Sequence, residues 1–162
     1  MISTSAAERI VDRIQTLTRA ADQKASALGI VQTGVPALLA ESLKEWFLSP
    51  VLAPYKPFVA AATVGWIVSL VLTTMVLMAR TQNRGRKSLT FFGDISSLSI
   101  EDYRSQLDSV DDAALAHDFA DQAWVCAGIC NRKYFLLKWT IRVLAWSWGL
   151  MLLCYFVRGM WG

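Results

Sequence analysis

Charged residues are spaced very unevenly along this chain, and residues 58–79 form a long apolar segment without any charge. As a helix the segment would be about 33 Å long, which matches the roughly 30 Å hydrocarbon core of a bilayer. The pattern therefore predicts a transmembrane helix over residues 58–79.

A second apolar segment covers residues 136–157 near the C-terminus. Lys138 and Arg142 lie in its first two turns, where long basic side chains can extend to the membrane interface. A helical period of apolar residues continues back toward Asp111, and no proline follows that residue. We therefore expect one helix to run from a soluble part of the chain into the bilayer.

Residues 1–25 are predicted to form an amphipathic cytoplasmic helix. Apolar residues recur at spacings of three and four, which places them on one helical face, while charged residues occupy the other positions. The predicted apolar face consists of Ile10, Ile14, Leu17, Ala21, Ala25 and Leu28. We expect this face to pack against a partner helix.

Residues 26–48 form the weakest of three candidate spans. Apolar residues dominate positions 25–40, where Gln32 and Pro36 interrupt them, and a helix over these positions would be only about 24 Å long. The segment can cross the bilayer only by including residues 41–48 or by thinning the bilayer locally, and a re-entrant or interfacial helix is the alternative. Aromatic residues and prolines between Glu41 and Pro57 predict a short connector at the membrane surface.

Composition and charge agree with a membrane protein. Hydrophobic residues make up 54% of the chain and the mean hydropathy is +0.37, whereas soluble domains are about 45 to 50% apolar. Four basic residues follow the segment 58–79 directly: Arg80, Arg84, Arg86 and Lys87. The positive-inside rule then predicts that the N-terminus and residues 80–135 are cytoplasmic and that the C-terminus is outside.

The cytoplasmic region 80–135 is acidic and predicted to be helical. Ser99 and Ser109 each precede an aspartate by three residues, a spacing typical of helix starts, and Gly93 with Asp94 predicts a turn. Eight carboxylates lie between residues 94 and 121: Asp94, Glu101, Asp102, Asp108, Asp111, Asp112, Asp118 and Asp121. They lack the spacing of a calcium loop, so a solvated helix face is favoured over a cation site.

No motif for catalysis, cofactor binding or metal binding occurs in the sequence. A phosphate-cradling glycine loop, paired histidines and a nucleophile elbow are all absent. Cys126 and Cys130 share a helical face, but a zinc site would need two further ligands, and packing cysteines are favoured. The basic residues flank the apolar segments and are not clustered for nucleic-acid binding. We therefore expect that the protein is not an enzyme and that it binds no cofactor, no metal ion and no nucleic acid.

Two charged clusters are predicted to lie near the inner leaflet: Arg19 with Asp22 and Lys24, and Gly93 with Asp94. Opposite charges could clamp the cytoplasmic helices to the spans. Alternatively, Arg19 and Lys24 could hold a phosphate and form a sensing surface.

Gly65 and Ser69 lie four residues apart in the segment 58–79, which is the spacing of a small-xxx-small motif. Small residues at this spacing allow two helices to approach closely. We therefore expect helix packing at Gly65 and Ser69.

Three short elements follow one another along the chain: RAADQKA at 19–25, FFGDI at 91–95 after a span and a basic exit, and NRKY at 131–134 before the last span. Their order and spacing resemble those of the membrane effectors of bacterial Pycsar anti-phage systems. The resemblance implies an effector in the bacterial inner membrane that responds to cyclic CMP or cyclic UMP from a partner cyclase. It also implies membrane impairment and growth arrest or abortive infection. We further hypothesise that the chain forms a homo-oligomer in the lipid bilayer.

The residues predicted to contact the nucleotide are Arg19, Lys24, Asp94 and Lys133. The predicted fold is all-α, a helical integral membrane protein with about three transmembrane helices and a small helical cytoplasmic part. Two rival functions remain open: a membrane scaffold or accessory subunit that binds a protein through the acidic helices without ligand gating, and a holin-like pore without any ligand.

Overall fold

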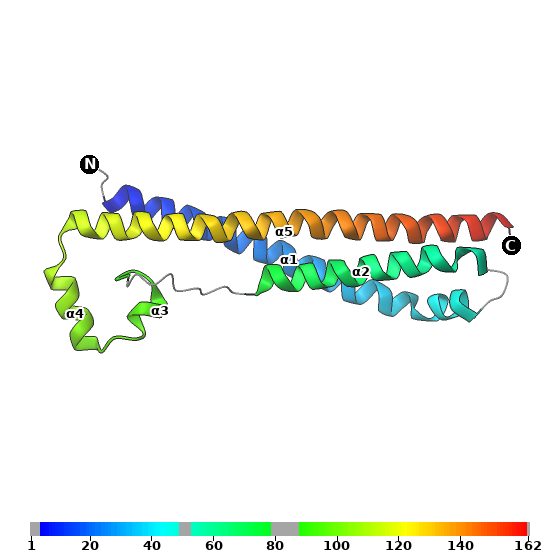
Figure 1. The fold of residues 1–162 in the computed structure, drawn as a ribbon, viewed down its shortest axis with the longest axis horizontal. Helices are drawn as coiled ribbons and strands as arrows, with labels where there is room; N and C mark the ends of the chain where they lie inside the picture. Colours follow the sequence, from blue (N-terminus) through cyan, green and yellow to red (C-terminus); the bar gives the residue numbers. More distant parts are fainter. Residues whose placement is uncertain (1–3, 49–52, 79–87, 162) are drawn as a thin grey trace. The chain divides into compact units, whose positions relative to one another are not determined.

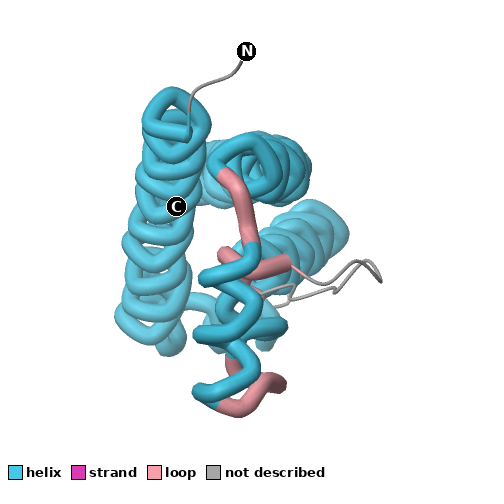
Figure 2. Tube along the Cα trace, turned by 90° about the vertical axis from the view of Figure 1, so that its left-hand side faces the viewer, coloured by secondary structure: helices cyan, strands magenta, loops and turns pink. Residues whose placement is uncertain are grey.

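The structure is a computed structural model that describes residues 4–48, 53–78 and 88–161. Within these ranges 91% of the chain is helical and no strand occurs, which confirms the all-α fold (Figure 2). The elements in Figure 1 are α1 Thr4–Leu48, the 3-10 helix η1 Ala53–Tyr55, α2 Lys56–Leu77, α3 Phe92–Ile95, α4 Ile100–Ser109 and α5 Asp112–Trp161.

The chain divides into two compact units. The first unit comprises Met1–Ala21 and Ala79–Lys133, and the second comprises Asp22–Met78 and Tyr134–Gly162. Helices α1 and α5 each contribute residues to both units.

Two of the described helices are long and apolar enough to cross a membrane. Their ranges are Ala53–Leu77 and Asp112–Val157. The first contains most of the predicted span 58–79, and the second contains the predicted span 136–157. A crossing by residues 26–48 stays a prediction, as does the count of three spans.

In the second unit, α2 and α5 run antiparallel, as Figure 1 shows. Near the start of α2, Val59 packs against Cys154. Near its end, Val76 packs with Leu137 of α5 and Ala25 of α1. These two clusters fix the register of α2 along α5.

In the first unit, the buried face of α1 matches the predicted one only in part, since Ala21 is buried as predicted but Ile10 and Leu17 are not. Small residues are buried on α1 and on α5: Ala7, Val11, Ala21, Ala116 and Ala123. Ile10 and Leu17 were expected on the buried face but are 53% and 46% exposed. Alanine lets helix backbones approach closely, and the larger apolar side chains then lie at the side of that contact.

The starts of α4 and α5 lie where the sequence predicts them, but one cap residue differs. Ser99 Oγ accepts the backbone N–H of Asp102 at 3.1 Å and caps α4. At α5 the acceptor is Asp111 Oδ1, which takes the N–H of Ala114 at 2.7 Å. Ser109 is the last residue of α4, and its hydroxyl donates to Gln106 O.

The connector expected between Glu41 and Pro57 is mostly helical. Helix α1 continues through Pro36 to Leu48, and α2 begins with Pro57 in its first turn. Proline lacks the backbone N–H but fits the first turn of a helix, where that group has no partner. Pro50 and the basic residues Arg80, Arg84, Arg86 and Lys87 lie outside the described residues. The turn expected at Gly93 and Asp94 is a single turn of helix, α3.

Candidate functional site

A loop of the first unit is folded around the carboxylate of Asp118 on α5. Asp118 Oδ2 accepts the backbone N–H groups of Leu89 and Thr90, both at 3.1 Å. It also accepts the hydroxyls of Ser88 at 3.0 Å and Thr90 at 2.8 Å. One half-buried carboxylate oxygen therefore fixes three consecutive residues.

Three further side chains complete this arrangement. Gln122, one turn after Asp118, accepts the Thr90 hydroxyl at 2.9 Å and donates to Thr90 O at 3.4 Å. Asp94 on α3 accepts the Ser88 N–H at 2.9 Å and is 6% exposed. Tyr103 on α4 donates to Leu89 O at 3.3 Å. We call Ser88, Thr90, Asp94, Asp118 and Gln122 the Asp118 cluster.

The Asp118 cluster has the chemistry of a loop anchor. Its two carboxylates accept N–H and O–H groups of the chain itself, and hydrogen bonds to charged acceptors are stronger than neutral ones. Among the residues that the structure covers, no group of three or more His, Cys, Asp or Glu side chains could hold a metal ion. The arrangement can position residues 88–94, which include the FFGDI element, against α5.

A second polar cluster lies within the second unit and joins α1, α2 and α5. Gln32 Nε2 donates to Ser69 Oγ at 2.6 Å, and Thr73 Oγ1 donates to Gln32 Oε1 at 2.9 Å. Trp66 Nε1 donates to Gln32 O at 3.0 Å. Ser69 Oγ in turn donates to Thr140 O on α5 at 3.2 Å. We call these five residues the Gln32 cluster.

The Gln32 cluster is neutral and enclosed. Gln32, Ser69 and Thr140 have no exposed surface, and Thr73 is 4% exposed. Across the described side chains, no buried nitrogen or oxygen lacks a hydrogen-bond partner. Because an unsatisfied polar group in a lipid environment costs several kcal/mol, this network makes polar side chains compatible with a membrane setting.

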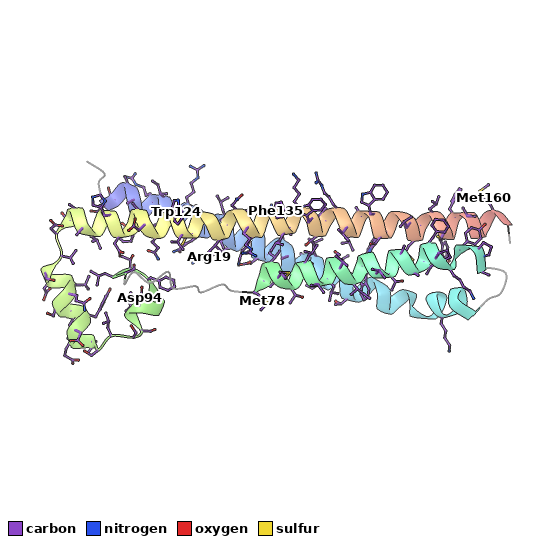
Figure 3. The ribbon with its side chains drawn as sticks, viewed as in Figure 1. Arg19, Met78, Asp94, Trp124, Phe135 and Met160 are labelled. Carbon is purple, nitrogen blue, oxygen red and sulfur yellow. The ribbon has the colours of Figure 1, made fainter. Side chains whose placement is uncertain are left out.

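The four residues predicted to contact a nucleotide lie in different units. Arg19, Asp94 and Lys133 belong to the first unit, and Lys24 belongs to the second. Arg19, labelled in Figure 3, is exposed, Lys133 is half-buried, and Asp94 is part of the Asp118 cluster. The Lys24 Nζ atom lies 5.8 Å from the ring centroid of Tyr134, in a cation–π contact. Their role in binding stays a prediction.

The residues Gly65 and Ser69 lie on α2 where it meets α5. A side chain at Gly65 would collide with the Ser147 hydroxyl, and Ser69 bonds to Thr140 O. The close approach in this structure is therefore one between two helices of the same chain. Cys130 and Cys154 are buried and Cys126 is half-buried, all three as free thiols.

The sequence predictions missed the residues that organise both clusters. Asp118 was only one of eight carboxylates, although its i, i+4 spacing to Gln122 places both on one helical face. From the sequence alone, Gln32 is only a polar interruption of an apolar segment. A polar side chain inside a candidate span is itself a signal, because it requires a partner from another helix.

One comparison with known proteins gives a match. The family model described as the Pycsar effector protein domain matches residues 6–159. No curated protein and no solved structure matches the chain.

Proposed function

The chain belongs to the Pycsar effector protein family, and we propose that it is an inner-membrane effector that responds to cyclic CMP or cyclic UMP by impairing the membrane. The observation that carries the proposal is the extent of the match, which includes residues of both units and both apolar helices. Growth arrest before phage matures is the proposed outcome in an infected cell.

The proposed mechanism is a change in helix packing. A ligand shifts a protein between two states only through unequal affinity for them, so the nucleotide must bind the membrane-impairing state more tightly. Helices α1 and α5 contribute residues to both units, which supports their role in transmitting a change from one unit to the other. No step of this mechanism requires catalysis.

We propose that Arg19, Lys24 and Lys133 supply positive charge for the cyclic phosphate, and that Asp94 positions the FFGDI element. Guanidinium and ammonium groups both bind phosphate, the former in a bidentate way. The exposure of Arg19 and Lys24 supports access by a ligand, and the bond from Ser88 N–H to Asp94 supports a positioning role.

The proposed topology has three spans, with the N-terminus and residues 80–135 in the cytoplasm and the C-terminus outside. The basic residues after the second span support the orientation, and the bonds from Gln32 to α2 support a third span in α1. Alkaline phosphatase fused after residue 162 should be active and a fluorescent protein fused there should be dark. The reverse pattern would exclude this topology.

The decisive experiment measures membrane potential in cells that express the full chain. We expect a potential-sensitive dye to report depolarisation when a pyrimidine cyclase is co-expressed, and no change with an inactive cyclase. Toxicity without a cyclase would favour the holin-like pore. An unchanged potential with active cyclase and intact protein would refute the proposal.

Calorimetry with the purified chain separates a ligand-gated effector from a scaffold. We expect saturable heat with cyclic CMP or cyclic UMP and none with cyclic AMP. Arg19→Gln should weaken binding, whereas Arg13→Gln, which removes another exposed arginine of α1, should not. A scaffold would show no saturable heat with any nucleotide. Light scattering on the same samples tests the proposed homo-oligomer.

A further inference from the structure

The part of α5 in the second unit carries a row of exposed aromatic and basic side chains. Phe135, Trp139 and Trp146 are 58%, 44% and 75% exposed, and Lys138 and Arg142 are exposed as well. Their spacings of three and four residues place them on one side of the helix. We call Phe135, Lys138, Trp139, Arg142 and Trp146 the Trp139 face, and Figure 3 labels Phe135 at its start.

Contacts along this face fix the direction of the Arg142 side chain. The guanidinium carbon of Arg142 lies 5.5 Å from the ring centroid of Trp139, one turn earlier in the helix. The rings of Phe135 and Trp139 meet edge to face with centroids 6.3 Å apart. Helical side chains lean toward the N-terminus of their helix, so Arg142 extends toward the N-terminal end of the span.

The register between α2 and α5 shows how deep Arg142 lies. Leu137 packs against Val76, and α2 ends at Leu77. Arg142 comes five residues after Leu137, so its backbone lies about 7.5 Å further along the span. A cation facing lipid at this depth is costly unless its side chain reaches the interface. The direction of Arg142 over Trp139 is the one that reduces this cost.

The part of α5 that carries this face has no carboxylate of its own, and the second unit has Asp or Glu only at positions 22, 41 and 45. The sequence contains no Asp or Glu at positions 23–40, 46–93 or 122–162. These ranges include all of α2, the apolar part of α1 and the whole C-terminal part of α5. If the Trp139 face of a second copy packed against this face, it would add two further cations, its own Lys138 and Arg142, and no anion. This favours an anion from outside the chain as the partner of Lys138 and Arg142.

We propose that the Trp139 face binds the phosphate group of an anionic phospholipid. Arg142 supplies a bidentate donor for the phosphate and Lys138 a second positive charge. Trp139 holds the guanidinium at the level of the lipid headgroups, where tryptophan is enriched in membrane proteins. A phospholipid is favoured over other anions because the face lies on an apolar span, where headgroups are the available phosphates.

Electron spin resonance with spin-labelled lipids tests this site on the full chain in phosphatidylcholine vesicles. We expect the chain to immobilise spin-labelled phosphatidylglycerol roughly fivefold or more over spin-labelled phosphatidylcholine, since a basic residue near the surface attracts anionic lipid. Lys138→Gln with Arg142→Gln should lower this ratio severalfold, to the level that the other basic residues of the chain maintain. Lys44→Gln with Lys56→Gln removes the same charge elsewhere in the second unit and should keep the preference.

Four results would overturn the proposal. The first is an equal affinity of the unmodified chain for both lipids, and the second is displacement of the labelled lipid by cyclic CMP or cyclic UMP. The third is an undiminished lipid preference in the variant with Lys138→Gln and Arg142→Gln. The fourth is a variant of this kind that changes the oligomeric state of the chain but keeps the lipid preference of the unmodified chain. The unmodified chain gives a result that does not depend on the folding of any variant. Its preference should fall with added salt, because salt screens exposed charges.

Discussion

The Gln32 cluster and the Asp118 cluster each join several segments of the chain, but they use different chemistry. In the second unit an amide, two hydroxyls, an indole and backbone carbonyl groups form a neutral network, and Gln32 has no exposed surface. In the first unit a half-buried carboxylate binds two backbone N–H groups and two hydroxyls. Burying a charge costs far more than burying a paired neutral group. The chain thus uses charge for the loop and neutral groups among its apolar helices.

The largest loss of local stability is expected from removing the charge of Asp118, which holds the loop of residues 88–90. Asp118→Ala leaves the N–H groups of Leu89 and Thr90 without their acceptor. Since hydrogen bonds to a charged group contribute about 1.5 to 3 kcal/mol each, hydrogen exchange of these amides should accelerate roughly a hundredfold. Mass spectrometry of the deuterated chain measures this rate.

Two variants control for the Asp118 result. Asp118→Asn keeps an acceptor oxygen and should show a smaller acceleration. Asp108→Ala removes an exposed carboxylate from α4 and should leave the exchange of residues 89 and 90 unchanged. Unchanged exchange in Asp118→Ala would show that the loop is held by other contacts.

A smaller loss of stability is expected from forcing apart α2 and α5, two of the helices that carry the Gln32 cluster. Gly65→Val places a branched side chain against Ser147, whose hydroxyl bonds to Val143 O at 2.8 Å. Overpacking of this kind typically costs about 1 to 3 kcal/mol, and the variant should unfold at a lower fraction of denaturing detergent. Gly149→Val, at a site with no atom nearby, is the control. Equal stability of the two variants would contradict the close contact of α2 and α5.

Removing the side-chain amide of Gln32 should lower the stability of the chain by less still. Gln32→Leu deletes both side-chain bonds to α2 and replaces the amide by an apolar side chain of similar size. Polar contacts between membrane helices contribute about 0.6 kcal/mol on average, so we expect a loss of about 1 kcal/mol in the same detergent titration. Thr33→Val removes an exposed hydroxyl that bonds within its own helix and should have almost no effect.

A double-mutant cycle sharpens this prediction. Ser69 links Gln32 to Thr140, so Ser69→Ala combined with Gln32→Leu should cost less than the sum of the two single losses. Strict additivity would mean that the two side chains act independently.

The smallest effect on stability is expected at an exposed charge. Lys24→Gln removes the cation–π contact to Tyr134, and such exposed contacts contribute no more than about 1 kcal/mol. If Lys24 contacts the nucleotide, calorimetry should show weaker binding while stability changes little. Unchanged affinity would remove Lys24 from the proposed site.

The sequence predicts the helices well because their signals are local. The charge-free segment 58–79 corresponds to α2, and the proline-free sequence after Asp111 corresponds to α5. The cap at Ser99 depends on a residue three positions away. Each of these features is determined by neighbours within a few turns.

Features that depend on distant residues are not predictable in the same way. Ile10 and Leu17 share a helical period with Ala21, but only Ala21 is buried, because burial depends on what packs against α1. Asp118 became the loop anchor only through residues 28 to 30 positions away.

The Gln32 cluster also bears on how the chain enters the membrane during synthesis. The partner of Gln32 on α2 comes 37 residues later, and the bond from Ser69 to α5 spans a further 71 residues. Until α2 has been made, the amide of Gln32 lacks its two side-chain partners, Ser69 and Thr73. The first helix is therefore expected to settle in the bilayer only after α2 has been made, so a chain that ends before α2 should be a poor membrane protein and a target for degradation.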